Sequence, residues 1–276
     1  MTRIALLQSR TGIDPGANAR ALVAAVEEAA SGGAEILFTP EMSGLLDRDR
    51  ERAAAHLRTQ AEDPALAAVR SAAAQAGMWV HLGSLAIREE NGSRLRNRGF
   101  LITKSGDIRA SYDKLHLFDV DLATGESWRE SASYAPGGRA VVADSPAGPL
   151  GLSICYDLRF PDLSRALTDA GAQVLAIPAA FTVPTGLAHW HVLIRARAIE
   201  AGAFVVAAAQ WGRHEDGRET YGHSLVVGPW GEVLLDMGEG EGLAFAEIDL
   251  AAVEAVRARL PALRHRRPIP PVERIA

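Results

Sequence analysis

The stretch from Pro149 to Ile177, PLGLSICYDLRFPDLSRALTDAGAQVLAI, decides the fold of this chain. It starts with an aliphatic segment that ends at Cys155, passes through a helical segment from Pro161 to Ala170, and reaches a second aliphatic segment, Gln173 to Ile177. Two short aliphatic segments on either side of a helix are typical of parallel strands joined by a crossover helix. The stretch therefore predicts an α/β protein.

The same alternation occurs in the first third of the chain. Ile4–Gln8 and Glu35–Phe38 are predicted strands on either side of a helix from about Ala17 to Ala30. A second predicted helix, Pro64–Ala76, precedes another strand, Met78–Leu85. Repeated strand–helix–strand units predict a parallel core in this half as well.

Two antiparallel hairpins interrupt this pattern. Arg98–Thr103 and Ile108–Tyr112 flank a Ser-Gly-Asp turn, and Ser224–Val227 and Glu232–Leu235 flank a Pro-Trp-Gly turn. A mixture of parallel and antiparallel strands favours sheets that pack on each other with helices outside over one open, doubly wound sheet.

Length and composition place the chain among globular proteins. It has 276 residues, of which 48% are apolar and 23% charged, with no internal repeat or low-complexity linker. We therefore expect one domain over residues 1–276. Four prolines, Pro261, Pro268, Pro270 and Pro271, predict an extended C-terminal tail from about residue 261 to 276, in a position to pack on a partner subunit.

Charge and cysteine usage narrow the classes of function. The formal net charge of −5 argues against nucleic-acid binding. The longest apolar run, Ala203–Ala209, is far shorter than the roughly 18 residues of a membrane span, and the N-terminus lacks the pattern of a signal peptide. A single cysteine cannot form an intramolecular disulfide. These features predict a cytoplasmic protein whose partner is a small molecule or a protein.

Three residues are candidates for catalysis. Cys155 and Glu41 each follow a predicted strand, at the sheet edge where α/β proteins bind ligands. Lys114 is one of only two lysines among 29 basic residues and follows a strand between apolar neighbours. A compact ammonium fits beside a thiolate or a developing oxyanion where a planar guanidinium does not. Taken singly, Cys155 also fits a buried structural residue, and Glu41 fits a solvated loop residue.

The motifs around these residues resemble those of the nitrilase superfamily of carbon–nitrogen hydrolases. They are Thr-Pro-Glu41, Tyr-Asp-Lys114-Leu-His-Leu-Phe-Asp and Cys155-Tyr-Asp-Leu-Arg-Phe-Pro, and their order and spacing match that family. A fourth acid, Glu130, stands where the family has a second glutamate. The similarity runs from Ile4 into the C-terminal tail.

This resemblance implies a four-layer α-β-β-α sandwich that carries a Glu-Lys-Cys triad and assembles as a homodimer or a higher homo-oligomer. It makes Cys155 the nucleophile, Glu41 the general base and Lys114 the stabiliser of the tetrahedral oxyanion. Glu130 would orient Lys114 and the substrate, and the backbone N–H of Tyr156 would complete the oxyanion hole. No cofactor and no metal are implied.

A thiol and a carboxylate are poorly matched for proton transfer in water. Free cysteine has a pKa near ~8.5 and free glutamate near ~4.3, so the transfer is unfavourable by about 6 kcal/mol. We expect burial to raise the pKa of Glu41, and Lys114 and the helix that starts near Phe160 to lower that of Cys155. The two pKa values would then approach each other.

The second half of the chain points to a substrate class. Ala179–Trp190 and Ala207–Trp211 are similar to the branch of the superfamily that contains deaminated glutathione amidase and ω-amidase, and closer to the first. We expect hydrolysis of a linear amide of a small carboxylated substrate through a thioester. The alternatives are ω-amidase activity on α-ketoglutaramate, then a broader aliphatic amidase, nitrilase or carbamoylase, and last an idle scaffold.

Five residues near this segment are candidates for lining the substrate pocket. Arg159, Thr182 and Thr185 would supply cationic or hydroxyl contacts for a carboxylate, and Phe181 and Trp190 would form apolar walls. Trp190 also stands at helical spacing from apolar neighbours, so a place in the core fits it equally well.

Other catalytic motifs are incomplete. Gly151-Leu-Ser153-Ile-Cys155 and Gly222-His-Ser224-Leu-Val226 each lack the final glycine of the serine-hydrolase elbow. His189 and His191 are two residues apart on a predicted helix and face different directions, so they are not predicted to form a metal pair.

Overall fold

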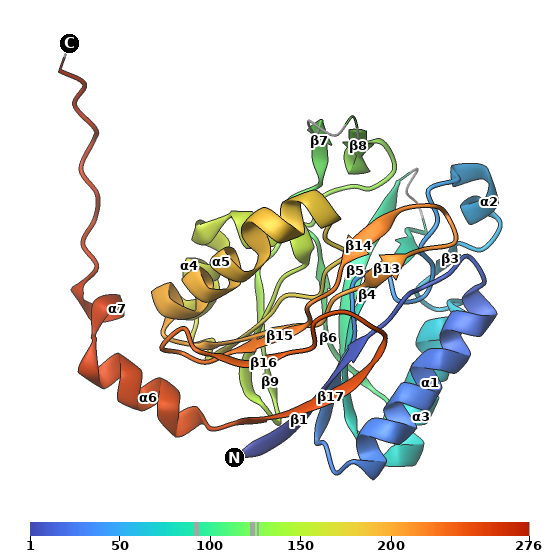
Figure 1. The fold of residues 1–276 in the computed structure, drawn as a ribbon, viewed down its shortest axis with the longest axis horizontal. Helices are drawn as coiled ribbons and strands as arrows, with labels where there is room; N and C mark the ends of the chain where they lie inside the picture. Colours follow the sequence, from blue (N-terminus) through green and yellow to red (C-terminus); the bar gives the residue numbers. More distant parts are fainter. Residues whose placement is uncertain (91–93, 122–124, 126, 276) are drawn as a thin grey trace.

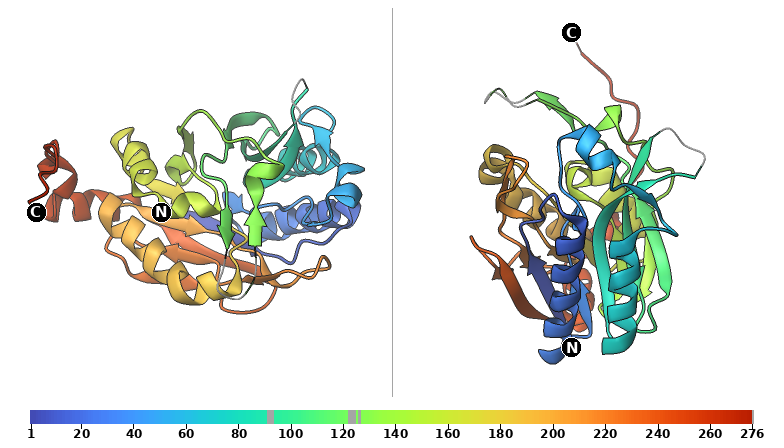
Figure 2. Two further views of the ribbon diagram at one scale, coloured as in Figure 1. Left: turned by 90° about the horizontal axis from the view of Figure 1, so that it is seen from above. Right: turned by 90° about the vertical axis from the view of Figure 1, so that its right-hand side faces the viewer.

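The computed structural model describes residues 1–90, 94–121, 125 and 127–275. Its core consists of two β-sheets packed face to face, with a pair of helices on the outer side of each (Figures 1 and 2). Helices α1 (Pro15–Ser31) and α3 (Pro64–Ala76) cover the first sheet, and α4 (Pro161–Asp169) and α5 (Val183–Ala201) cover the second. The predicted α-β-β-α sandwich is confirmed.

The first sheet is built around three parallel strands. Its order is β17-β1-β2-β4-β5-β6, in which β1, β2 and β4 are parallel and the outer neighbours are antiparallel. A short strand, β3, pairs with β4. The bounds are β17 (Gly242–Ile248), β1 (Thr2–Gln8), β2 (Ile36–Phe38), β3 (Arg58–Thr59), β4 (Trp79–Arg88), β5 (Leu95–Ile102) and β6 (Ile108–Asp113).

The second sheet repeats this plan with the order β16-β15-β12-β11-β10-β9, of which β10, β11 and β12 are parallel. Two small antiparallel pairs, β7 with β8 and β13 with β14, lie outside both sheets. The bounds are β9 (Val141–Ser145), β10 (Gly148–Leu152), β11 (Val174–Ala176), β12 (Phe204–Ala207), β15 (Leu225–Val227), β16 (Val233–Asp236), β7 (Asp119–Asp121), β8 (Ser127–Arg129), β13 (Trp211–Arg213) and β14 (Glu219–Tyr221).

Aliphatic side chains from both sheets form one buried cluster between them. Ile4 and Phe38 from the first sheet belong to the same cluster as Leu150 and Val174 from the second, and all four are at most 1% exposed. Full burial of a side chain of this size contributes roughly 1.5–3 kcal/mol. This dry interface holds the two sheets in a fixed relation, and so fixes the loops that leave their edges.

Helix α3 shows how local signals set an element's ends. The Asp63 side chain accepts a hydrogen bond from Leu66 N at 2.8 Å and caps the first turn, and Pro64 occupies the first helical position. Gly77 ends the helix in the left-handed region at φ 63°. The helix predicted over 64–76 is confirmed at both ends.

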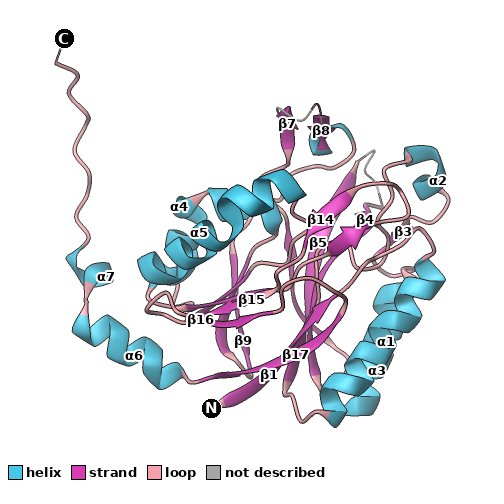
Figure 3. Cartoon of the chain, in the orientation of Figure 1, coloured by secondary structure: helices cyan, strands magenta, loops and turns pink. Residues whose placement is uncertain are grey.

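The C-terminal part differs in detail from the prediction. After β17 the chain forms α6 (Leu250–Arg259), which was not predicted, and a one-turn helix, α7 (Ala262–His265), inside the stretch expected to be an extended tail. Residues 266–275 form neither helix nor strand and lead away from the two sheets (Figure 3). No helix among the residues described is both long and apolar enough to cross a membrane.

Chain segments that carry the candidate residues leave the sheets at one edge. Glu41 follows the parallel strand β2, and Cys155 follows the parallel strand β10 across the sandwich. The two strands belong to the two facing sheets, and the segments after their carboxyl ends line one cavity. Residues 114 positions apart in the sequence therefore meet.

Candidate active site

Cys155 occupies a tight turn between β10 and α4. It begins a 3₁₀ turn, η2 (Cys155–Arg159), with φ at 49°, in the left-handed region that a residue with a side chain seldom adopts. Its N–H donates to the Pro178 carbonyl at 2.9 Å, and the side chain is 7% exposed. The turn holds the sulfur at the floor of a cavity, on backbone fixed by the second sheet.

Asp157 ties this turn to the segment after Lys114. Its buried carboxylate accepts hydrogen bonds from Ile154 N at 2.9 Å, from the Tyr112 hydroxyl at 2.7 Å and from His116 N at 3.0 Å. The His116 ring stacks on Phe160 with centroids 3.6 Å apart. A single acid thus couples the positions of the cysteine turn and the lysine segment.

Glu41 is a buried carboxylate with a full set of donors. Its Oε1 accepts from Lys114 Nζ at 2.9 Å and from Asn97 Nδ2 at 2.8 Å, and its Oε2 accepts from Ala180 N at 2.9 Å. The residue is 4% exposed. The Cys155 thiol lies close enough to Glu41 that each of the two groups shifts the pKa of the other. Its orientation is therefore determined on both oxygens, with the sulfur in reach.

Lys114 lies between two carboxylates. Besides Glu41, its Nζ contacts Glu130 Oε2 at 2.9 Å and Oε1 at 3.2 Å, and Lys114 is 2% exposed. Glu130, in the 3₁₀ turn η1 (Glu130–Ala132), also accepts from Phe118 N at 2.7 Å and from Asn97 Nδ2 at 3.0 Å. With a neutral thiol, the group carries one positive and two negative charges.

The pKa values follow from these contacts. Burial opposes the charge on Lys114, but Glu130 and Glu41 outweigh it, so the pKa of the ammonium lies well above its ordinary value. Burial also opposes ionisation of Glu41, but the Lys114 charge and hydrogen bonds from Lys114, Cys155 and Asn97 leave its pKa lowered. Burial, and then repulsion by Glu41, raises the pKa of the Cys155 thiol well above normal.

The expectation that the pKa values of Glu41 and Cys155 approach each other is therefore wrong for the resting site. Lys114 contacts the carboxylate directly at 2.9 Å, so its charge stabilises Glu41 more than it stabilises a thiolate. The resting site holds a carboxylate, an ammonium and a neutral thiol.

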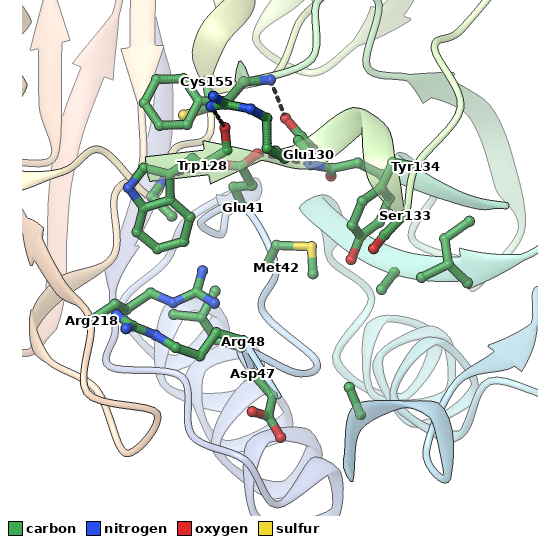
Figure 4. A pocket seen from close by; sticks show the side chains of 18 of the residues that line it. Glu41, Met42, Asp47, Arg48, Trp128, Glu130, Ser133, Tyr134, Cys155 and Arg218 are labelled. Atoms are coloured by element: carbon green, nitrogen blue, oxygen red, sulfur yellow. Dashed lines mark hydrogen bonds between the residues drawn. The ribbon is translucent and has the colours of Figure 1, made fainter. Parts of the chain in front are cut away.

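These side chains line one end of a cavity of about 1220 Å³ (Figure 4). Of the residues predicted to bind substrate, Phe181, Thr182 and Thr185 line the cavity, and so does Tyr156. The Thr182 and Thr185 hydroxyls lie 2.8 Å apart. The structure therefore brings these three side chains and the four candidate catalytic residues to one space.

Arg159 and Trp190 are not among the residues that line this cavity. Trp190 is fully buried behind Phe181, with ring centroids 4.9 Å apart, and its Nε1 donates to the His223 carbonyl at 2.8 Å. Trp190 is therefore a core residue, as its helical spacing allowed, and it does not form a wall of the substrate pocket. The Arg159 guanidinium lies 5.2 Å from the Phe181 ring centre, outside the lining.

Several lining residues were missed by the sequence analysis. Asn97 is 2% exposed and joins Glu41 to Glu130; it lies one residue before the predicted strand Arg98–Thr103, and no sequence signal marked it. Six arginines also line the cavity: Arg48, Arg50, Arg88, Arg94, Arg129 and Arg218. Arg48 and Arg50 stand at the start of α2, and the other four come from strand ends and loops elsewhere in the sequence, so no sequence pattern predicts that the six meet.

His189 and His191 have different partners, as their spacing indicated. The His189 ring nitrogen lies 3.3 Å from Arg159, whereas His191 lies 3.0 Å from Asp236. His223 also contacts Asp236, at 2.9 Å, so two imidazoles share this carboxylate. This partially exposed cluster lies outside the cavity lining, and the sequence analysis did not foresee it.

Comparisons with known proteins agree with the motifs. A family model described as carbon-nitrogen hydrolase matches residues 3–258. The chain is 41% identical to deaminated glutathione amidase of Bos taurus over 269 residues, which cover 96% of this chain and 82% of that protein.

Solved structures with the same fold include two informative ones. The NitFhit protein of Caenorhabditis elegans matches with a TM-score of 0.89 and 38% identity, over 96% of this chain and 65% of that one. A mutant of the amidase from Nesterenkonia sp. AN1 matches with a TM-score of 0.80 and 27% identity, over 96% of this chain and 94% of that one. In that amidase structure, the acetamide moiety of fluoroacetamide is bound covalently to the active-site cysteine.

Proposed function

The chain belongs to the carbon–nitrogen hydrolase family, and from this premise we propose that it hydrolyses deaminated glutathione, with Cys155 as nucleophile. Deaminated glutathione carries a keto group in place of the α-amino group of glutathione. Its scissile amide joins a 2-oxoglutaryl group to cysteinylglycine. Hydrolysis consumes one water and gives 2-oxoglutarate and cysteinylglycine.

The observation that carries this proposal is the contact between a buried thiol, carboxylate and ammonium in one cavity. Glu41 accepts from Lys114 and raises the pKa of the neighbouring Cys155 thiol, and Glu130 holds Lys114 from the other side. A core cysteine would need none of these partners. The covalent adduct on the cysteine of the Nesterenkonia amidase supports the same role for Cys155.

In the first step, Cys155 Sγ bonds to the amide carbon while its proton passes to Glu41, and the carbonyl π electrons move onto oxygen. Because the pKa values of the thiol and the carboxylate are far apart in the resting site, transfer must accompany formation of the S–C bond. The net charge of the group stays constant, since the negative charge moves from Glu41 to the new oxyanion. Lys114 and the Tyr156 N–H stabilise that oxyanion.

Collapse of the adduct breaks the C–N bond, and Glu41 returns its proton to the departing amine nitrogen. A thioester on Cys155 remains. Glu41, again a carboxylate, accepts a proton from water as the water oxygen attacks the thioester carbon. The second adduct then expels the Cys155 sulfur, which regains its proton from Glu41, and the free acid leaves.

The surroundings support a carboxylated substrate. The six lining arginines favour anions, and the Thr182 and Thr185 hydroxyls can donate to a carboxylate near the reacting carbon. Deaminated glutathione carries two carboxylates and fits a cavity of this size. ω-Amidase activity on α-ketoglutaramate is the second candidate, since that substrate shares the acyl half.

The proposal includes assembly and location. Several large apolar side chains are exposed on α5 and on the β15–β16 hairpin, including Leu187 at 71%, Val192 at 68% and Trp230 at 55%. Such a patch supports a homodimer through this face. We place the enzyme in the cytoplasm, as a single domain with a C-terminal tail.

A panel of substrates tests the proposal. Purified protein is assayed for 2-oxoglutarate from deaminated glutathione and α-ketoglutaramate, and for ammonia from N-carbamoyl amino acids and simple nitriles. We expect the highest kcat/KM for deaminated glutathione. Preference for a nitrile or a carbamoyl compound would contradict the proposed substrate, and silence on all four would contradict the enzymatic function.

A further inference from the structure

Two arginines and a tryptophan form a group in the cavity that the mechanism does not use. Arg48 lies in the loop before α2 (Arg50–Ala54), Arg218 in the turn before β14, and Trp128 on β8. All three line the cavity, and in Figure 4 Arg48 and Arg218 lie away from Cys155 and Glu130 while Trp128 lies between these two groups. The Arg48 and Arg218 guanidinium carbons lie 5.6 and 5.1 Å from the Trp128 ring centre. We call them the Arg48–Trp128–Arg218 group.

One buried carboxylate holds both arginines. Asp216 Oδ2 accepts from the Arg48 backbone N–H at 2.8 Å and from Arg218 Nε at 2.7 Å. The Asp216 side chain is fully buried, which makes this contact an anchor for the Arg48 loop rather than a surface ion pair. The Asp216 charge also offsets that of Arg218.

The Arg48 guanidinium keeps its charge uncompensated. Among residues 1–90, 94–121, 125 and 127–275, no carboxylate forms an ion pair with it. A guanidinium on a rigid loop, next to a flat ring and facing a cavity, is a bidentate receptor for a carboxylate. Because Asp216 already holds the Arg48 backbone, binding orders only the Arg48 side chain beside the Trp128 ring.

We propose that the Arg48–Trp128–Arg218 group binds the carboxylate on the amine half of the substrate, which is the glycine carboxylate when the substrate is deaminated glutathione. This inference rests on the proposed function. The acyl carbon must lie at Cys155, and we assign the contacts of the acyl half to Phe181, Thr182 and Thr185, which line the same cavity. The departing dipeptide spans roughly 7 Å when extended, so it reaches into the rest of the cavity.

The group would therefore determine specificity. α-Ketoglutaramate has only an NH₂ on the amine side and gains nothing from a second anion site. Deaminated glutathione gains an Arg–carboxylate contact that remains in the transition state, which raises its kcat/KM. The enzyme would therefore distinguish the two leading candidate substrates by the amine half of the molecule, because both share the same acyl half.

The test compares three substrates with two variants. Arg48→Gln removes the guanidinium without disturbing the backbone contact to Asp216. Arg213→Gln is the matched control, because Arg213 is exposed on the neighbouring strand β13 and does not line the cavity. The substrates are deaminated glutathione, its glycinamide analogue and α-ketoglutaramate. We avoid substitution of Arg218, since it would leave Asp216 buried without its ion pair.

We expect Arg48→Gln to lower kcat/KM for deaminated glutathione at least about tenfold, mostly through KM, and to change that for α-ketoglutaramate less than twofold. The wild type should turn over the glycinamide analogue about as slowly as Arg48→Gln turns over the acid, and Arg213→Gln should behave as wild type. Equal loss on all substrates, or no preference of the wild type for the acid over the amide, would overturn this site alone. No turnover of any of the three by the wild type would overturn the proposed function itself.

Discussion

Lys114 makes two contacts of 2.9 Å, one to Glu41 and one to Glu130, and both carboxylates also accept from the Asn97 amide. A buried ammonium is tolerated here because two buried anions surround it. The same contacts explain the lowered pKa of Glu41, which the motif spacing alone did not predict. Spacing along the chain identified the reacting residue types, but charge balance depends on distances of a few ångströms.

Lys114→Arg tests whether the shape of the cation matters. A planar guanidinium cannot fit the space of a compact ammonium between Glu41 and Glu130 without displacing one of them. We expect kcat/KM to fall by about 10³-fold or more, while thermal unfolding stays cooperative. The measurement is steady-state release of 2-oxoglutarate, with circular dichroism for the fold. A rate within a few-fold of wild type would show that any cation suffices.

Among the helices and strands, the sequence predicted those that begin and end at a recognisable capping or turn residue. Helix α3 has a capping aspartate, a first-turn proline and a left-handed glycine, and it was predicted at both ends. Helix α6 was not predicted, because its sequence shows little of the apolar periodicity that indicates a helix. In the structure it buries a single residue, Val253. The left-handed backbone conformation of Cys155 could not be predicted either, because glycine is the residue that usually signals this conformation and the position holds a cysteine.

Strand β4 carries an acid-sensitive group. His81 is 2% exposed, its Nδ1 has no hydrogen-bond partner among the described residues, and burial lowers its pKa from 6.5 to about 4. The folded state keeps this ring neutral, while the unfolded chain takes up a proton below pH 6.5. Its stabilising effect is therefore complete above pH 6.5 and is lost as the pH falls towards 4.

We expect His81→Leu to reduce the difference in unfolding free energy between pH 7 and pH 4 by about 3 kcal/mol relative to wild type. Denaturant titrations at both pH values measure this. His56→Gln, a change at an exposed histidine, is the control and should keep the wild-type difference. An unchanged difference in His81→Leu would mean that other groups cause the acid sensitivity.

At the level of the whole molecule, two sheets bring together segments that the sequence keeps apart. Glu41, Lys114 and Cys155 each follow a predicted strand, but it was the resemblance to the nitrilase superfamily that predicted their convergence. The Arg48–Trp128–Arg218 group was not predicted, because its members lie on loops whose meeting depends on how the two halves of the sandwich pack. Loop geometry is the part of the site that local sequence patterns do not encode.

The arginine-rich lining predicts a salt effect. Although the whole chain carries −5, six arginines face the cavity, so a dianionic substrate is attracted locally. Raising ionic strength from 0.01 to 0.15 M shortens the Debye length from about 30 to about 8 Å. We expect kcat/KM for deaminated glutathione to fall several-fold over this range, with kcat little changed. A salt-independent kcat/KM would contradict local attraction.

Turnover of deaminated glutathione by Cys155→Ala is the most direct test that the sulfur, Glu41 and Lys114 act as one catalytic group. We expect no 2-oxoglutarate above the uncatalysed rate, with a melting curve close to that of the wild type because one sulfur at a cavity floor contributes little to packing. Hydrolysis at a rate near that of the wild type, by a folded Cys155→Ala protein, would contradict the account.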